Sequence, residues 1–146
     1  MIDKTFTEIY KEAKYVVLRP NDSFRLKVGE HSSEVDELLI KNGTESAYFI
    51  TPENPFSQSL CETENAFRHQ RFLGILNDKS VPYVEGYGTD VNEVWGKERS
   101  YLLFYDDFEC IQTLAAHFGQ KGILQITTGQ PVGLLMLGEL RYKQVC

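Results

Sequence analysis

The order of strand-like and helix-like segments after residue 45 limits the fold of this chain more than any other feature. Apolar, β-branched and aromatic residues indicate five strands, and a 3.6-residue periodicity indicates two helices. In chain order these are a strand at 46–51, a helix at 62–78, strands at 82–88 and 99–105, a helix at 107–118, and strands at 122–127 and 131–137. The order β-α-β-β-α-β, with one appended strand, is that of the ferredoxin-like or split-βαβ unit. An α+β sheet with another strand order fits the same pattern.

The residues before this unit predict a helix, a β-hairpin and a short helix. In chain order these segments are 3–14, then the two hairpin arms 15–18 and 24–28, then 33–42. Pro20 has turn chemistry between the arms, and the last helix begins with a capping pattern at Ser33 and ends at Asn42-Gly43. A chain of 146 residues without linkers or repeats suits one hydrophobic core. We therefore predict a single α+β domain over residues 1–146, folded as a two-layer sandwich of helices against one sheet.

Charge and composition argue against several classes of partner. The formal net charge is −6, and the 15 lysines and arginines are scattered among 21 acids, so we do not expect a nucleic-acid partner. No apolar run approaches the roughly 20 residues of a membrane-spanning helix, and the N-terminus lacks a secretory signal pattern. We therefore expect no membrane partner, a cytoplasmic location, and reduced thiols at Cys61, Cys110 and Cys146. No metal-binding spacing or cofactor motif occurs, so neither a metal nor a cofactor is expected.

The helix at 62–78 carries an unusual stripe of side chains. At 100° per residue, the face that contains Phe72 is apolar toward the C-terminal end of the helix. Toward the N-terminal end, the same face carries Asn65, Arg68 and His69. A buried arginine costs several kcal/mol unless it is paired, so we expect a partner for Arg68.

In the predicted topology, polar residues from several elements gather at one edge of the sheet. The end of the first strand, the start of the first helix, the hairpin between the middle strands and the exit of the second helix all lie at this edge. The candidate ligand-binding residues there are Asn54, Ser57, Asn65, Arg68, Glu98, Ser100 and Gln120, with Tyr87 and Trp95 beside them. Glu98 shares one face of its strand with Leu102 and Phe104. If this face lies under the helices, Glu98 is the natural partner of Arg68.

Two interpretations of this cluster stay open. In the first, Arg68 and Glu98 form an internal pair that fixes how helix and sheet meet, with Asn65, Ser100 and Gln120 as hydrogen-bond partners. In the second, the cluster opens to solvent and binds a small polar or anionic ligand, because a guanidinium near a helix N-terminus suits a carboxylate or phosphate.

The three histidines differ in their expected roles. His69 borders the polar cluster and is the histidine that we consider as a proton carrier. His117 lies off the apolar stripe of its helix and His31 lies in a polar turn, so both are expected to be exposed.

Several of these polar residues resemble the signature of a protein family. The motifs are Asn54-Pro55-x-Ser57, Glu64-Asn65-x-x-Arg68, Trp95-x-x-Glu98-x-Ser100 and Phe118-Gly119-Gln120, with Phe24-x-Leu26-x-Val28-Gly29 and the strand at 48–51 upstream. On these motifs the chain resembles, over roughly residues 15–137, the bacterial family of short proteins known as domain of unknown function 3293. The resemblance implies a bacterial or phage-borne cytoplasmic protein with one domain, and it brings no activity or substrate. Pro52 departs from the pattern, which has Ala after Thr51, and this affects the turn that positions Asn54 and Ser57.

We consider three functions, in descending order. The first is a binding or regulatory domain with a pocket for a small polar or anionic ligand. The second is a protein-interaction module, for example a homodimer formed through the strand at 131–137, whose apolar run at 132–135 needs cover if it lies on an edge. The third is a small hydrolase or transferase with Glu98 as general base and Arg68 as electrophilic clamp. A raised Glu98 pKa inside a pocket would favour the third function.

Overall fold

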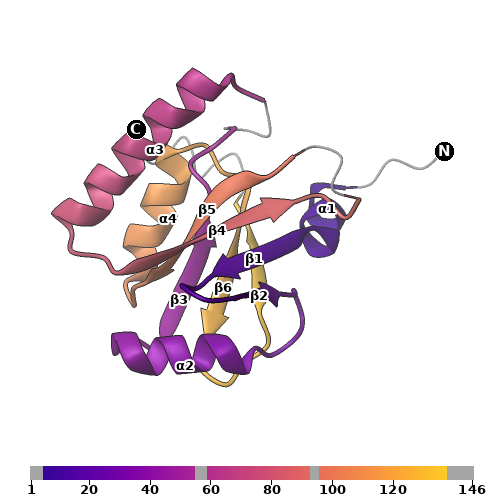
Figure 1. Ribbon diagram of the computed structural model, residues 1–146, viewed down its shortest axis with the longest axis vertical. Coiled ribbons are helices and arrows are strands. Elements are labelled where there is room, and N and C mark those ends of the chain that lie inside the picture. Colours follow the sequence, from indigo (N-terminus) through magenta and orange to yellow (C-terminus); the bar gives the residue numbers. More distant parts are fainter. Residues whose placement is uncertain (1–4, 55–58, 93–95, 138–146) are drawn as a thin grey trace.

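The computed structural model describes residues 5–54, 59–92 and 96–137, and within them four helices and seven strands (Figure 1). The helices are α1 (Phe6–Glu12), α2 (Ser33–Asn42), α3 (Glu62–Asp78) and α4 (Phe108–His117). The strands are β1 (Lys14–Leu18), β2 (Ser23–Leu26), β3 (Ser46–Ile50), β4 (Tyr83–Thr89), β5 (Glu98–Phe104), β6 (Gly122–Thr127) and β7 (Gly133–Met136). Each of these elements corresponds to a predicted one, and the α+β class is confirmed.

The described strands form one sheet with the order β2-β1-β4-β5-β3-β6-β7. All neighbouring strands in this order are antiparallel. Strands β4, β5, β3 and β6 are contiguous, and α3 connects β3 to β4 while α4 connects β5 to β6. The hairpin of β1 and β2 therefore extends the sheet on the β4 side, and β7 extends it on the β6 side.

The sheet curls until its two ends meet. Val28, just after β2, forms a parallel bridge with Val132, just before β7. The N–H of Gly29 donates to the Val132 carbonyl (2.8 Å), and the N–H of Val132 donates to the Glu30 carbonyl (3.0 Å). The curled sheet consequently has an inner and an outer face.

Both faces bury hydrophobic residues, in two separate clusters. The outer cluster joins α3 and α4 to the sheet, and its largest members include Tyr48, Phe72, Tyr101, Leu103, Ile111 and Phe118. The inner cluster is covered by α2, and it includes Tyr15, Phe24, Val35, Leu39, Phe49, Leu102 and Phe104. Figure 1 shows α3 and α4 together on one side of the sheet and α2 away from them. The predicted two-layer sandwich does not account for this inner core.

Strand β5 divides its residues between the two clusters. Tyr101 and Leu103 lie in the outer cluster under α3 and α4, and Leu102 lies in the inner cluster. Because side chains alternate along a strand, Glu98 and Ser100 face the inner side together with Leu102. The predicted pairing of Glu98 with Arg68 assumed that this face of the strand lies under the same helices as Arg68. In the structure it does not.

We expect substitution by alanine to have different effects on stability at two glycines of β4. A Cβ at Gly86 would meet the Val16 carbonyl oxygen and the Phe49 ring (2.9 Å), whereas a Cβ at Gly88 would lie 3.6 Å from the Tyr15 ring, an ordinary contact. We expect Gly86→Ala to lower the free energy of unfolding by about 2–3 kcal/mol, because backbone and core must shift to make room. Gly88→Ala should change it by less than about 0.5 kcal/mol. Urea denaturation followed by circular dichroism measures both values, and equal losses would contradict this account of β4.

Candidate functional site

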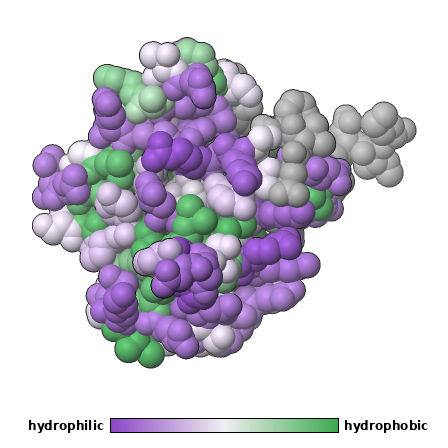
Figure 2. Space-filling view, in the orientation of Figure 1, coloured by the Kyte–Doolittle hydropathy of each residue, from purple (hydrophilic) through white to green (hydrophobic). Residues whose placement is uncertain are grey.

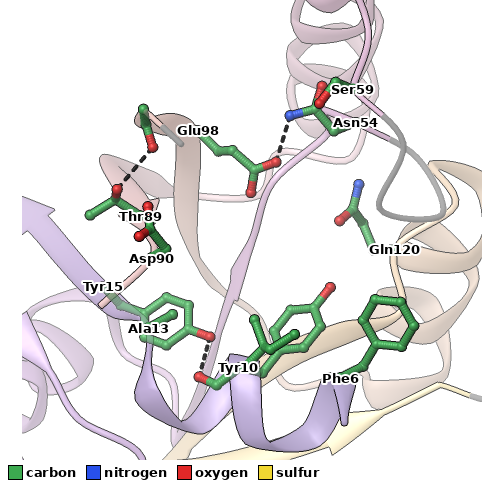
Figure 3. Close-up of a pocket in the computed structure, with 13 residues that line it drawn as sticks. Phe6, Tyr10, Ala13, Tyr15, Asn54, Ser59, Thr89, Asp90, Glu98 and Gln120 are labelled. Carbon is green, nitrogen blue, oxygen red and sulfur yellow. Dashed lines mark hydrogen bonds between the residues drawn. The ribbon is translucent and has the colours of Figure 1, made fainter. Parts of the chain in front are cut away.

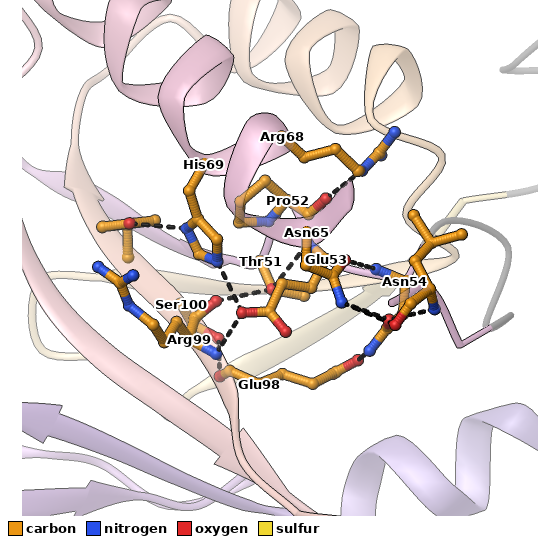
Figure 4. Close-up of polar contacts among 12 residues, drawn as sticks. Thr51, Pro52, Glu53, Asn54, Asn65, Arg68, His69, Glu98, Arg99 and Ser100 are labelled. Atoms are coloured by element: carbon orange, nitrogen blue, oxygen red, sulfur yellow. Dashed lines mark hydrogen bonds and ion pairs between the residues drawn. The ribbon is translucent and has the colours of Figure 1, made fainter. Parts of the chain in front are cut away.

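Residues 51–54, here called the 51–54 loop, form the point where α3, α4 and β5 meet (Figure 4). The Thr51 hydroxyl donates to the Arg99 carbonyl (2.8 Å) and accepts from the N–H of Glu53 (3.1 Å). The N–H of Arg99 donates to Glu53 Oε2 (3.0 Å). These bonds fasten the loop to the start of β5, so the loop follows the position of that strand.

Asn54 connects the loop to α3 and to β5. Its φ of 49° lies in the left-handed region, which asparagine tolerates better than most residues. Its Oδ1 accepts from the N–H of Leu60 (3.0 Å) and from Asn65 Nδ2 (3.0 Å), and its own N–H donates to Asn65 Oδ1 (3.1 Å). Its Nδ2 donates to Glu98 Oε2 (2.6 Å). One amide side chain thus fixes an unusual turn and orients an acid.

Arg68 turns toward the same loop, but it bonds to backbone oxygens instead of an acid. Its Nε donates to the Pro52 carbonyl (2.5 Å), and its Nη2 donates to the Phe118 carbonyl. The guanidinium also lies over the Phe118 ring, 5.2 Å from its centroid. Burial and the neighbouring Arg71 lower the Arg68 pKa. The predicted Arg68–Glu98 pair is wrong, because α3 packs on the outer face of β5 and Glu98 faces inward.

His69 belongs to a buried chain of polar groups on the outer face. Its Nδ1 lies 2.8 Å from the Tyr101 hydroxyl and its Nε2 lies 2.6 Å from Glu53 Oε2. Burial raises the pKa of Tyr101. His69 is 5% exposed, so the ring anchors the 51–54 loop and has little access to a substrate. The exposure predicted for His31 and His117 is confirmed.

A pocket of about 380 Å³ lies at the end of the inner face, beneath α1 (Figure 3). Aromatic rings of α1 and β1 line one wall, contributed by Phe6, Tyr10 and Tyr15. The polar side chains that line the pocket include Asn54, Thr89, Asp90, Glu98 and Gln120. The pocket therefore combines an apolar wall with a polar wall, as small-molecule sites commonly do.

A glycine in β4, the central strand of three, makes room for this pocket. Gly88 of β4 pairs with Tyr15 of β1 on one side and with Glu98 of β5 on the other. Residues directly opposite in an antiparallel sheet point to the same face. The missing side chain at Gly88 therefore leaves a gap between the Tyr15 ring and the Glu98 carboxylate.

The Glu98 carboxylate is half-buried at this gap, and its environment favours the protonated form. Burial raises the Glu98 pKa most, the Asn54 hydrogen bond lowers it, and the negative charge of Glu53 raises it. Burial also raises the pKa of the Tyr15 phenol, and Tyr10 and Glu98 add to this effect. Within the part of the chain that the structure describes, no cationic side chain forms an ion pair with Glu98.

Helix α1 lies over the pocket and contacts Tyr15, Lys121 and Gly122. The Tyr15 hydroxyl donates to the Tyr10 carbonyl (2.5 Å), and Lys121 Nζ lies 3.7 Å from the centroid of the Phe6 ring. The Tyr10 ring also packs on Gly122, where an added Cβ would approach it to 3.3 Å. No residue of α1 is fully buried, so the helix covers the pocket without entering the core.

The structure separates the seven predicted site residues into three groups. Asn54, Glu98 and Gln120 line the pocket, and Gln120 also donates to the Glu53 carbonyl (2.8 Å). The other described members support the loop or the strand: Asn65, Arg68 and Ser100, the last donating to the Glu98 carbonyl (3.0 Å). Ser57, like Trp95, lies outside the described residues.

Sequence reasoning missed the apolar wall of the pocket. Phe6, Tyr10 and Tyr15 read as ordinary core residues of a helix and a strand, and nothing in their spacing pointed to a ligand. The one available signal was Gly88, because a glycine inside a strand often marks a close approach or a space. No group of three or more side chains suited to a metal occurs among the described residues.

A family model described as "Protein of unknown function (DUF3293)" matches residues 50–123. This range includes the 51–54 loop, its partners on α3 and β5, and the pocket residues Glu98 and Gln120, whereas α1 and β1 precede it. No curated protein and no solved structure matches the chain.

The contacts of Arg68 predict how its removal affects stability. Arg68→Ala should lower the free energy of unfolding by about 1.5–3 kcal/mol, because the Pro52 and Phe118 carbonyls lose a charged donor. Arg71→Ala is the matched control, since this exposed neighbour also lies over the Phe118 ring (5.9 Å) but donates to no carbonyl of the loop. Chemical denaturation of both variants measures the difference, and equal losses would show that the carbonyl contacts of Arg68 add nothing.

Proposed function

The chain belongs to the DUF3293 family of proteins of unknown function, and from its site we propose that it binds a small polar molecule in the pocket beneath α1. The recognition group is Glu98, oriented by Asn54. Gln120 and Thr89 complete the polar wall, and the rings of α1 and β1 supply the apolar wall.

The observation that supports this proposal most is that the charged Glu98 side chain destabilises the folded state. A half-buried carboxylate whose pKa is raised by burial destabilises the folded state at neutral pH. An uncharged side chain such as glutamine would accept the same hydrogen bond from Asn54 without that cost. Acids whose pKa is perturbed inside a pocket are candidates for binding or catalysis.

The ligand that we propose differs from an anion held by Arg68. The guanidinium of Arg68 is engaged by the Pro52 and Phe118 carbonyls, and Arg68 is not among the residues that line the pocket. The Glu98 carboxylate at the pocket would repel a carboxylate or a phosphate.

The strand that suggested an interaction module is packed against the rest of the fold. Val132 is 2% exposed, and Leu134 and Leu135 pack against the inner and outer clusters respectively. Hydrophilic residues cover most of the face shown in Figure 2. The apolar run at 132–135 therefore offers no reason to propose a homodimer.

A second candidate function is acid–base catalysis by Glu98, which its raised pKa and its place in a pocket favour. In this case Glu98 would exchange a proton with the bound molecule. The expected clamp, Arg68, lies outside the pocket, so this candidate ranks below simple binding.

We also propose that β3, α3, β4, β5, α4 and β6 form a ferredoxin-like unit. The contiguous order β4-β5-β3-β6, its antiparallel pairing and the two helices on one face support this assignment. No helix of the described residues is long and apolar enough to cross a membrane. A bacterial source and a cytoplasmic location stay predictions.

The binding function can be tested on protein purified from its natural host. Native mass spectrometry should show a retained small molecule in the wild-type chain. Gly88→Val should lose that molecule while it keeps the fold, because a larger side chain fills the gap between Tyr15 and Glu98. An unchanged ligand peak in a folded Gly88→Val protein would place the binding site elsewhere.

The pKa of Glu98 predicts a stability gain when its charge is removed. The folded state holds the Glu98 proton more tightly than the unfolded chain, so stability is full at low pH and falls as pH rises through the raised pKa. Glu98→Gln should therefore raise the melting temperature at neutral pH by about 2–4 °C, or about 1 kcal/mol, and the gain should vanish at acidic pH. Glu85→Gln, which changes an exposed acid on β4, serves as the control in the same thermal scans. A melting temperature lowered by Glu98→Gln would identify the carboxylate as a structural group.

A further inference from the structure

We infer that the pocket beneath α1 recognises an organic ammonium group, such as a primary amine attached to a flat or apolar body. This inference rests on the proposed binding function and names the chemical class of the ligand. Three features of the pocket support it: the sign of its charged groups, the direction of its hydrogen bonds, and the rings of its apolar wall.

The charged side chains that line the pocket within the described residues are both acids. They are Asp90 and Glu98, and no lysine or arginine joins them in the lining. A half-buried carboxylate is most stable when a cation lies next to it. Because no lysine or arginine among the described residues forms an ion pair with Glu98, a bound cation is the complementary partner.

The side-chain amides of the polar wall donate hydrogen bonds to other groups of the protein. Asn54 Nδ2 donates to Glu98 (2.6 Å). Gln120 Nε2 donates to the carbonyls of Glu53 (2.8 Å) and Phe118 (3.3 Å). Both Gln120 donors and one of the two Asn54 donors are therefore used inside the protein, which disfavours a ligand that only accepts hydrogen bonds.

Two hydroxyls at the pocket also donate to carbonyls of the protein. The Tyr15 hydroxyl donates to the Tyr10 carbonyl (2.5 Å), and the Thr89 hydroxyl donates to the Gly96 carbonyl (2.9 Å) (Figure 3). Each of these oxygens keeps lone pairs for a donor from the ligand. An ammonium group has three donors and no acceptor, so it matches these two hydroxyls, whose protons are already used.

The opposite wall suits the organic part of such a ligand. Phe6, Tyr10 and Tyr15 present aromatic rings, which suit apolar groups. The faces of such rings also attract cations, and Lys121 Nζ already lies over the Phe6 ring, 3.7 Å from its centroid. No group of three or more metal-ligating side chains occurs among the described residues, so a bare metal ion is not favoured. The combination favours an organic cation.

Three probes with the same ring test the inference on the full chain: benzylamine, benzyl alcohol and benzoate. Ligand-observed NMR titrations at neutral pH should show benzylamine binding at least about tenfold more tightly than benzyl alcohol, and no binding of benzoate. Glu98→Gln should weaken benzylamine about tenfold, whereas the surface control Glu85→Gln should not change it. Gly88→Val should abolish the binding of benzylamine and of benzyl alcohol.

The possible outcomes separate the ligand class from the binding function. Benzyl alcohol or benzoate binding as tightly as benzylamine, with binding still blocked by Gly88→Val, would overturn the ammonium inference and leave the pocket as a binding site. Benzylamine affinity unchanged by Glu98→Gln would also overturn it. Binding of none of the probes, together with no retained molecule in the purified protein, would overturn both the inference and the proposed function.

Discussion

The hydrogen bonds of the Asn54 side chain hold together the parts of this molecule that matter for its site. The amide stabilises a left-handed turn after β3, and it bonds α3 through Asn65 and β5 through Glu98. Arg68 and Gln120 add donors to the carbonyls of the same loop, at Pro52 and Glu53. These bonds converge on four consecutive residues, so they connect the loop, the two helices and the acid to one another. Loss of the turn would therefore release Glu98 as well as the loop.

The curl of the sheet gives the polar residues two different roles. On the outer face, under α3 and α4, His69 and Tyr101 are buried and serve the packing of the 51–54 loop. On the inner face, Glu98 lies beside a gap that Gly88 creates and that the core does not fill. An acid in such a place weakens the folded state, which is the usual compromise between stability and a working site. The outer network is thus a support, and the inner gap is where a ligand can bind.

The two walls of the pocket come from different parts of the chain. The polar wall lies largely within residues 50–123, which match the family model, and the aromatic wall comes from α1 and β1, which precede that range. The side chains of α1 remain at least partly exposed. In the proposed function, the sheet supplies the charge recognition and α1 shapes the pocket.

The sequence alone determined the secondary structure, since the 3.6-residue and two-residue periodicities and the Gly, Pro and Asn stop signals are local properties of the chain. It also determined the inward stripe of α3, because helical geometry puts Asn65, Arg68 and Phe72 on one face in any fold. Only the tertiary structure decided which face of β5 lies under α3 and α4. The alternation of side chains along a strand defines two faces, but it does not tell which element covers each face. That choice separated Glu98 from Arg68, and the register of β1, β4 and β5 placed it across Gly88 from Tyr15, 83 positions away in the chain. The pocket depends on this pairing of strands that lie far apart in the sequence, which no local pattern in the sequence records.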